Sequence, residues 1–460
     1  MLGHDLQMQI TWQRQPQATE LVERYVNECV AKNSFLKNLK DDLMLHTSTR
    51  LFDWVDHIEL GFSDELDRDL EMTGFTREHA TPSYCTFHHP GAQLPRVVVK
   101  DEKHPFLGIA IVVDSIADFL MVRGLSAWIE GSPLSYFRRA IVSKENGVFV
   151  YVVERRGTSL MEPNDIKDTK LAKIHLAYEK WQSRPRHFDR EEDEEDGLRF
   201  AITTAEELVE LVGQPMAASI VLDVERKYWQ AKNRAGQIQK NRQDHLGMGW
   251  ANHDHHTFRS SRRYFRNLVR LFEILGFACR ERFYAGKEAG WGAQVMEHQQ
   301  VRLVLFIDVD LSPDEVNIDF AHHTLPDLPK LGTIGLWCAL HGESILKAGM
   351  HHLEAQFNFD KLQQDLQSCG INMMSPFSDL PYLKQAFTHG EMWKVSDARI
   401  RHLLSKNLIT KDEAHRFLTQ GALGSHLENL QRHEGFKGFN QKNVNVIIKK
   451  TDPREFTYGA

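Results

Sequence analysis

The chain has 460 residues, of which 42% are hydrophobic and 26% charged, and its formal net charge is −7. These values are ordinary for a globular protein of two or three domains, and the acidic balance argues against a surface devoted to nucleic acid or anionic membrane. No apolar run is long enough to span a bilayer, and the first residues lack the apolar core of a signal peptide, so we expect a cytoplasmic protein. Five scattered cysteines without a C-x-x-C pair argue against a disulfide framework or a thiolate zinc site.

The first 160 residues contain two copies of a strand–helix unit behind an N-terminal helix predicted at about 19–44. The first copy has a strand carrying His57 and Glu59 on one face and a helix that stops at Gly74. The second copy starts at residues 106–114 and closes with a hairpin whose turn is Asn146-Gly147. Its opening strand is wholly apolar, so we read residues 1–160 as an N-terminal domain of degenerate, non-catalytic modules.

Residues 161–247 change character and are predicted to form a helical connector. The uninterrupted acidic run 191–196 is typical of a solvated loop. Residues 203–213 predict an amphipathic helix capped at Thr204, with Glu207 three residues later. A basic helix follows at about 224–245, and it raises the alternative of a nucleic-acid binder.

The segment 251–311 predicts a strand, a helix and three further strands. At the two-residue period of a strand, a first group of side chains shares one face: His253, His255, Thr257 and Arg259. The next helix has apolar residues three and four apart and ends at Gly276, a position suited to a left-handed C-terminal residue. The order βαβββ follows.

A further copy begins at the doublet His351-His352 and runs through a helix that stops at Gly370. The histidine-to-glycine separations are similar in three copies, at 17 residues from His57 to Gly74 (74 − 57), 21 from His255 to Gly276 (276 − 255) and 18 from His352 to Gly370 (370 − 352). This self-similarity indicates repeated modules. Two more helices at about 396–407 and 410–421 and a strand at 443–450 are predicted after it, and we take 248–460 as one domain.

The central segment resembles a known family. An Asp254-His255 strand with Arg259, a helix ending in Gly276-Phe277, a strand with Arg280, Arg282 and Phe283, and the turn residue Lys287 are similar to the 2-oxoadipate dioxygenase/decarboxylase (hydroxyglutarate synthase) family. That family belongs to the vicinal oxygen chelate superfamily. The resemblance implies an α+β fold in which paired βαβββ modules form half-barrels, here with helical insertions.

The resemblance also implies a metal-binding catalytic domain at 248–460. Its ligands would be His255, His352 and a glutamate on a later strand, a set that suits iron(II), with manganese, zinc or nickel as surrogates. Module order favours Glu391, with Glu455 as the alternative. The family places an E-F-A-E-R-like segment around this glutamate, which the surroundings of Glu391 do not reproduce.

By the same resemblance, the substrates would be a 2-oxo acid and O2, and the products a 2-hydroxy acid and CO2. Arg259 and Thr257 would be catalytic, and Arg259 and Lys287 would bind substrate, because a guanidinium beside the metal suits a planar carboxylate. Other chelate-fold activities, such as an extradiol dioxygenase or an isomerase, stay open. So does a non-catalytic scaffold or nucleic-acid-binding protein, although the acidic chain makes nucleic acid the weaker partner.

Overall fold

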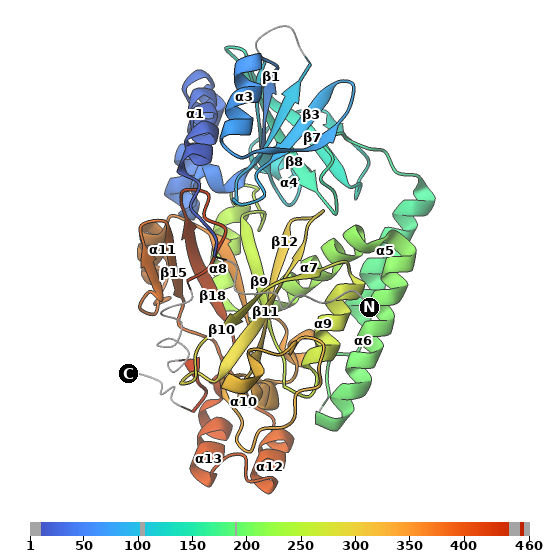
Figure 1. Ribbon diagram of the computed structural model, residues 1–460, viewed down its shortest axis with the longest axis vertical. Coiled ribbons are helices and arrows are strands. Elements are labelled where there is room, and N and C mark those ends of the chain that lie inside the picture. Colours follow the sequence, from blue (N-terminus) through green and yellow to red (C-terminus); the bar gives the residue numbers. More distant parts are fainter. Residues whose placement is uncertain (1–10, 102–105, 189–190, 441–450, 455–460) are drawn as a thin grey trace.

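The computed structural model describes residues 11–101, 106–188, 191–440 and 451–454. Two eight-stranded mixed sheets follow one another along the long axis of the molecule, with helices around them (Figure 1). The described helices are all too short or too polar to span a bilayer.

The first sheet contains two βαβββ modules. The first is β1 (Val55–Gly61), α3 (Asp64–Met72), β2 (Thr76–Ala80), β3 (Tyr84–His88) and β4 (Arg96–Lys100). The second is β5 (Leu107–Val112), α4 (Ile116–Val122), β6 (Ile129–Glu130), β7 (Phe137–Glu145) and β8 (Val148–Arg155). The strand order β2-β3-β4-β1-β5-β8-β7-β6 places the opening strands β1 and β5 side by side and antiparallel at the centre.

The second sheet repeats this plan. Its first module is β9 (His253–Arg259), α9 (Phe265–Ile274), β10 (Ala278–Tyr284), β11 (Trp291–His298) and β12 (Leu303–Asp310). Its second module is β13 (His352–Gln356), α11 (Phe359–Ser368), β14 (Ser378–Leu380), β15 (Leu383–Phe387) and β18 (His426–Arg432). The order β10-β11-β12-β9-β13-β18-β15-β14 again pairs the opening strands at the centre, antiparallel to each other. The predicted α+β fold of paired βαβββ modules in open half-barrels is confirmed.

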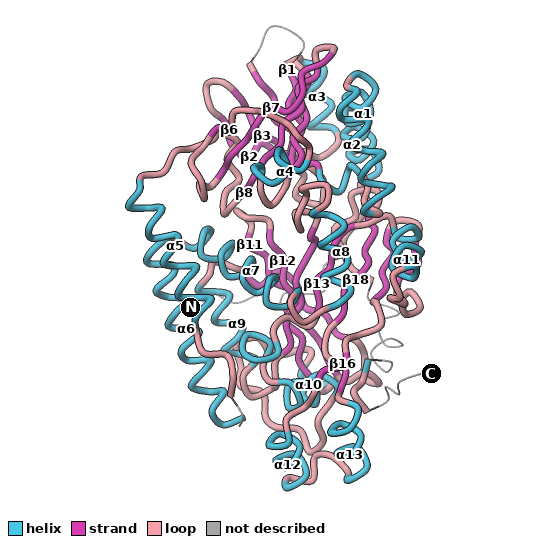
Figure 2. The backbone as a smooth tube through the Cα atoms, turned by 180° about the vertical axis from the view of Figure 1, so that it is seen from behind, coloured by secondary structure: helices cyan, strands magenta, loops and turns pink. Residues whose placement is uncertain are grey.

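The remaining elements surround the sheets or are inserted into them. Helices α1 (Pro16–Lys32) and α2 (Ser34–Asp42) and the short turns η1 (Leu43–Thr47) and η2 (Leu51–Trp54) precede the first sheet, and α5 (Asp168–Ser183), α6 (Glu191–Val212), α7 (Gln214–Gln230) and α8 (Arg234–Asp244) connect the two sheets. Turn η3 (Pro313–Glu315), α10 (Thr333–His341) and η4 (Ser344–Ala348) lie between β12 and β13. The fourth module is interrupted by β16 (Met392–Trp393), α12 (Asp397–Ser405), α13 (Lys411–Gln420) and β17 (Ala422–Leu423). Figure 2 shows α5, α6, α7 and α9 grouped on one side of the second sheet.

The acidic run corrects one prediction. Residues 191–196 are the first turns of α6 rather than a solvated loop. Helix α6 is continuous through Thr204, so this residue caps nothing and its hydroxyl donates to the carbonyl of Phe200 at 2.8 Å. Glu194 pairs with Arg399, and Glu195 with Arg263 at 3.1 Å, which explains why the acidic run is ordered against the second domain.

A β-bulge shapes the opening strand of the second sheet. Along β13, Glu354 pairs with His255 and Ala355 pairs with His253, so Asp254 is the extra residue on β9. The bulge turns His253 away from the face that His255 occupies, and the His253 ring packs against His256 at 5.2 Å. The prediction that His253 shares a face with His255 is therefore wrong, while Thr257 and Arg259 do share it.

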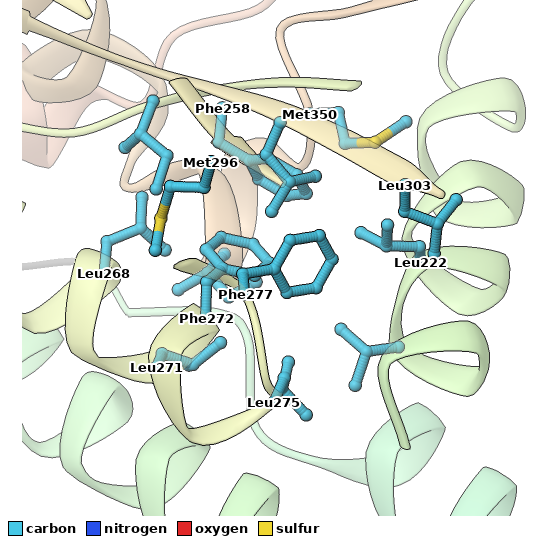
Figure 3. Close-up of a cluster of buried hydrophobic side chains, with 14 of the residues drawn as sticks. Leu222, Phe258, Leu268, Leu271, Phe272, Leu275, Phe277, Met296, Leu303 and Met350 are labelled. Carbon is cyan, nitrogen blue, oxygen red and sulfur yellow. The ribbon is translucent and has the colours of Figure 1, made fainter. Parts of the chain in front are cut away.

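Helix α9 packs its apolar side against the second sheet. Phe258 and Phe272 are fully buried with ring centroids 5.0 Å apart, and Phe277 packs edge-on against Phe272 at 5.6 Å. Figure 3 shows these rings with Leu268 and Met296 between the helix and the strands. This core holds β9 in place, and so it positions His255 on the opposite face of that strand.

Candidate metal centre

Three side chains meet in one row across neighbouring strands of the second sheet. Glu354 on β13 lies directly opposite His255 on β9 and Glu428 on β18. Ligand atoms of these residues lie within 4.8 Å of one another, and all three residues are buried. The topology thus brings together residues that are up to 173 positions apart in sequence (428 − 255).

His352 joins this row from the neighbouring position on β13. Its Nε2 lies 2.5 Å from Glu354 Oε1 and 3.7 Å from Glu428 Oε2, and His255 Nε2 lies 2.8 Å from the same Glu354 oxygen. Two imidazole nitrogens and two carboxylates therefore converge on one point. Such a donor set fits a divalent transition metal.

The protonation states support the same interpretation. Burial raises the pKa of Glu428 and of Glu354, and the neighbouring Glu428 charge raises the pKa of Glu354 further. Burial lowers the pKa of His255 to about 4 and that of His352 well below its usual value, so both imidazoles are neutral, the form that binds metals. Two buried carboxylates without a cation are costly, and Glu354 Oε2 has no hydrogen-bond partner among the described residues. A divalent ion would satisfy this need.

A second layer orients the first histidine. His255 Nδ1 donates to Asp254 Oδ1 at 2.9 Å, which turns Nε2 toward the carboxylates. Arg432 grips Asp254 through Nε and Nη2, each at 3.1 Å, and Gln356 and Gln93 donate to the same carboxylate. Metal-bound histidines are usually held by such a carboxylate.

Neighbouring polar side chains also contact Glu354, Glu428 and His352. Thr257 donates its hydroxyl proton to Glu354 Oε1 at 3.0 Å, and Gln385 Nε2 donates to Glu428 Oε1 at 2.8 Å. His351 Nδ1 lies 2.6 Å from His352 Nδ1. Thr257 therefore acts on the site through Glu354.

A largely aromatic cavity opens above these donors. It has an empty volume of about 600 Å³, and its apolar walls are Phe283, Trp291, Phe306, Phe377, Phe387 and Phe439. Arg259 and Asp308 also line the cavity, with Arg259 Nε 3.8 Å from Asp308 Oδ2. Both the Nε and Nη1 atoms of Arg259 are buried without a hydrogen-bond partner in the described structure. A guanidinium with two N–H groups free of hydrogen bonds in a largely apolar cavity suits an anionic ligand.

Other predicted site residues are not brought to this point. Glu391 Oε1 accepts a hydrogen bond from the backbone nitrogen of Arg234 at 2.8 Å, and Glu391 does not line the cavity. Lys287 is exposed in the turn between β10 and β11. Glu455 and the strand predicted at 443–450 lie outside the described residues.

The candidate carboxylate that the sequence analysis did not include is Glu428. The predicted strand around Glu391 is only the short β16, which pairs with β17 away from the main sheet, and the fourth module closes with β18 instead. Glu428 and Arg432 have the E-x-x-x-R spacing of the E-F-A-E-R-like segment that the family resemblance requires. The two-helix insertion α12–α13 moved this segment beyond the place where module order suggested it.

The first sheet holds a partial copy of the site. His57 Nδ1 lies 2.6 Å from Asp56, and Arg155 grips Asp56 at 2.6 and 2.8 Å, as Arg432 grips Asp254. The strand registers place Gly108, Ala110 and Tyr151 where the second sheet has His352, Glu354 and Glu428. In this copy Lys100 pairs with Glu59 at 2.8 Å, so an ammonium neutralises the acid.

Comparisons with known proteins add only distant likenesses. No family model matches the chain, and no curated protein matches it. Similar solved structures include a triple mutant of 4-hydroxymandelate synthase from Streptomyces coelicolor (11% identity, 87% of this chain and 98% of that chain, TM-score 0.28). Two others are a Mn(II)-bound glyoxalase from Novosphingobium aromaticivorans (9%, 83% and 82%, 0.19) and a glyoxalase/bleomycin resistance protein/dioxygenase superfamily member from Vibrio splendidus (13%, 21% and 94%, 0.17). TM-scores this far below 0.5 carry no argument, so the fold and the site rest on the strand order and the contacts described above.

Proposed function

We propose that the chain is a non-haem iron(II)-dependent dioxygenase/decarboxylase that acts on a 2-oxo dicarboxylic acid. The observation that carries the proposal is that His255, His352 and Glu428 meet around Glu354 in a largely apolar cavity, where two N–H groups of Arg259 have no hydrogen-bond partner among the described residues. Two imidazoles and a carboxylate on adjacent strands form the facial donor set of this enzyme class. Glu428 replaces Glu391 in the proposed ligand set.

The overall reaction balances with O2 as the only co-substrate. With 2-oxoadipate, the bond between C1 and C2 breaks, C1 leaves as CO2, one oxygen atom completes the new carboxylate and the other becomes a hydroxyl, giving 2-hydroxyglutarate. Iron(II) at the site would supply electrons to O2 and hold the 2-oxo acid beside it.

The chain's own residues supply orientation and a dry environment. Arg259 would bind the carboxylate at the far end of the substrate through two parallel hydrogen bonds. The aromatic walls would pack against the carbon chain and exclude water. Thr257 and Gln385 would keep the two carboxylates in place.

The full chain is first loaded with iron(II) under anaerobic conditions. The test is its oxygen consumption after it is mixed with a 2-oxo acid in aerated buffer. We expect uptake with 2-oxoadipate or 2-oxoglutarate, with O2, CO2 and 2-hydroxy acid in equal amounts, and much slower uptake with 2-oxohexanoate, which lacks the second carboxylate. Absence of uptake with every 2-oxo acid, in protein that binds one metal ion, would contradict the oxygenase proposal.

A second candidate function follows from Glu354. If it binds the metal together with the other three donors, only two of six octahedral positions stay open. Two positions suffice for a chelating substrate but leave none for O2, which favours a chelate-fold isomerase or epimerase. Metal-dependent conversion of a substrate without oxygen uptake would select this alternative.

The nucleic-acid alternative loses support because several of its cations form contacts within the chain. Lys232 Nζ donates to the carbonyls of Lys347 and Ala348 at 3.0 and 2.6 Å, and Trp229 is buried. Arg242 pairs with Asp365 at 2.5 Å. On the neighbouring helix, Arg270 faces Glu206 at 3.6 Å.

A further inference from the structure

A second and larger hollow lies between the two sheets, and we name it the Arg302 groove. It has an empty volume of about 1290 Å³ that is open to solvent. Its charged walls include Glu78 and Arg96 from the first sheet and Arg280, Glu297, Arg302 and Lys437 from the second half of the chain.

The groove and the metal-site cavity share a wall. The ring of Phe439 lines both hollows and packs against His255, with ring centroids 4.9 Å apart. Asp254, which orients His255, also lines the groove. A molecule held in the groove would therefore lie one side chain away from the metal ligands.

Most cations of the groove pair with acidic side chains. Arg96 donates to Glu78 through two bonds of 2.6 and 2.9 Å. Arg280 pairs with Glu281 at 2.5 Å and with Glu297 at 3.4 Å, and Lys437 pairs with Glu297 at 3.2 Å.

Among the described residues Arg302 forms no ion pair, and its Nη2 donates to the carbonyl of Leu94 at 3.0 Å. Arg302 is an exposed residue and lines the groove.

The backbone conformation at this position does not favour an arginine. Arg302 closes the β11–β12 turn with φ of +55°, in the left-handed region that glycine and asparagine adopt at less cost. An arginine placed there, with its guanidinium in a basic hollow, is better explained by anion binding than by turn geometry.

We propose that the Arg302 groove is the vestibule of the metal site and collects substrates that carry two or more carboxylates. Cations that surround a concave entrance raise the local concentration of anions and the rate at which they associate. The ligand then passes Phe439 to reach the cavity in which Arg259 binds one of its carboxylates. This inference rests on the proposed function for the identity of the ligand, but its test does not require turnover.

The direct test is calorimetric titration of the metal-free full chain with 2-oxoadipate at low ionic strength. The wild type and its variants are compared in an Arg259→Gln background, which removes the carboxylate contact of the inner cavity, so the binding that remains reports on the groove. We expect Arg302→Gln to weaken binding by about tenfold, the loss of one charge-assisted contact. The control Arg199→Gln removes the same charge from the exposed side of α6 and should leave binding unchanged.

A second measurement follows the association rate of 2-oxoadipate with zinc-loaded protein by stopped-flow fluorescence. Arg302→Gln should slow association about tenfold at low salt, with little change at about 1 M salt, where such attraction is screened. Equal effects of Arg302→Gln and Arg199→Gln, or no anion binding to the wild type, would overturn the vestibule. Groove binding without oxygen uptake would instead contradict only the oxygenase proposal, so the two failures are distinguishable.

Discussion

Asp254 and Arg432 form a buried, two-bond ion pair directly behind the first histidine of the proposed metal centre. The same pair recurs in the first sheet as Asp56 and Arg155, again beside a histidine. An Asp–Arg pair that orients a histidine therefore occurs in both sheets. Among the described residues, the full set of metal donors occurs only in the second sheet.

This duplication provides a matched test of the Asp254 contact. Asp254→Asn removes the charge that orients His255, so we expect metal affinity to fall by about 10- to 100-fold. Asp56→Asn breaks the equivalent pair in the first sheet and should cost similar stability without weakening metal binding. Equal metal affinity in both variants, measured by competition with a chromophoric chelator, would contradict the assigned role of Asp254.

Arg259→Lys tests the substrate contact. Lysine keeps the charge but loses the planar pair of donors, so kcat/KM for a 2-oxo dicarboxylic acid should fall by about 10- to 100-fold while metal content is unchanged. A monocarboxylic 2-oxo acid should be much less affected. If both substrates lose activity equally, Arg259 supports the site rather than the distal carboxylate.

Asp308 predicts a pH dependence of substrate binding. Burial raises the pKa of Asp308 to about 7 despite the nearby Arg259. Below pH 7 Asp308 is neutral, so Arg259 is free to pair with the substrate carboxylate. Above pH 7 Asp308 is ionised and competes with the substrate carboxylate for Arg259. The affinity of zinc-loaded protein for 2-oxoadipate should therefore fall as pH rises from 6 to 8. The fall should be up to about tenfold for each unit by which bound substrate raises the pKa of Asp308.

The control for this prediction is Asp308→Asn, which cannot ionise. The affinity of this variant for 2-oxoadipate, measured by calorimetry, should depend less on pH than that of the wild type. An unchanged slope in Asp308→Asn would assign the titration to another group.

The core behind β9 gives a stability prediction. Phe272 is fully buried between α9 and the sheet, so Phe272→Ala should lower the free energy of unfolding by about 3–5 kcal/mol. Phe200 on α6 is 50% exposed, and Phe200→Ala should cost below about 1 kcal/mol. Urea denaturation of both variants measures the free energy of unfolding. Comparable decreases in the two variants would contradict a special contribution of the α9 core to stability.

Local patterns were sufficient to predict the fold because each module carries its own signals. The helix stops at Gly74, Gly276 and Gly370 all have positive φ, as expected for a left-handed C-terminal position. Their repetition predicted the paired modules. The domain limits at 160 and 247 stay a prediction.

The proposed metal ligands were harder to predict because they depend on register and on an insertion. His255 lies on β9 and His352 begins β13, the opening strands on which module order placed them. Glu354 was overlooked although it lies two residues after His352 and shares its face, and Glu428 was hidden by the α12–α13 insertion. A single bulge at Asp254 also decided which histidines point into the cavity, and bulges leave no clear signal in a sequence.

The most direct test of the central claim is the metal content of protein purified without chelator, measured by elemental analysis for the wild type and four variants. The account predicts one divalent ion per chain in the wild type, its loss in His255→Ala and Glu428→Ala, and its retention in His57→Ala and Glu391→Ala. Metal retained in Glu428→Ala and lost in Glu391→Ala would contradict the centre proposed here.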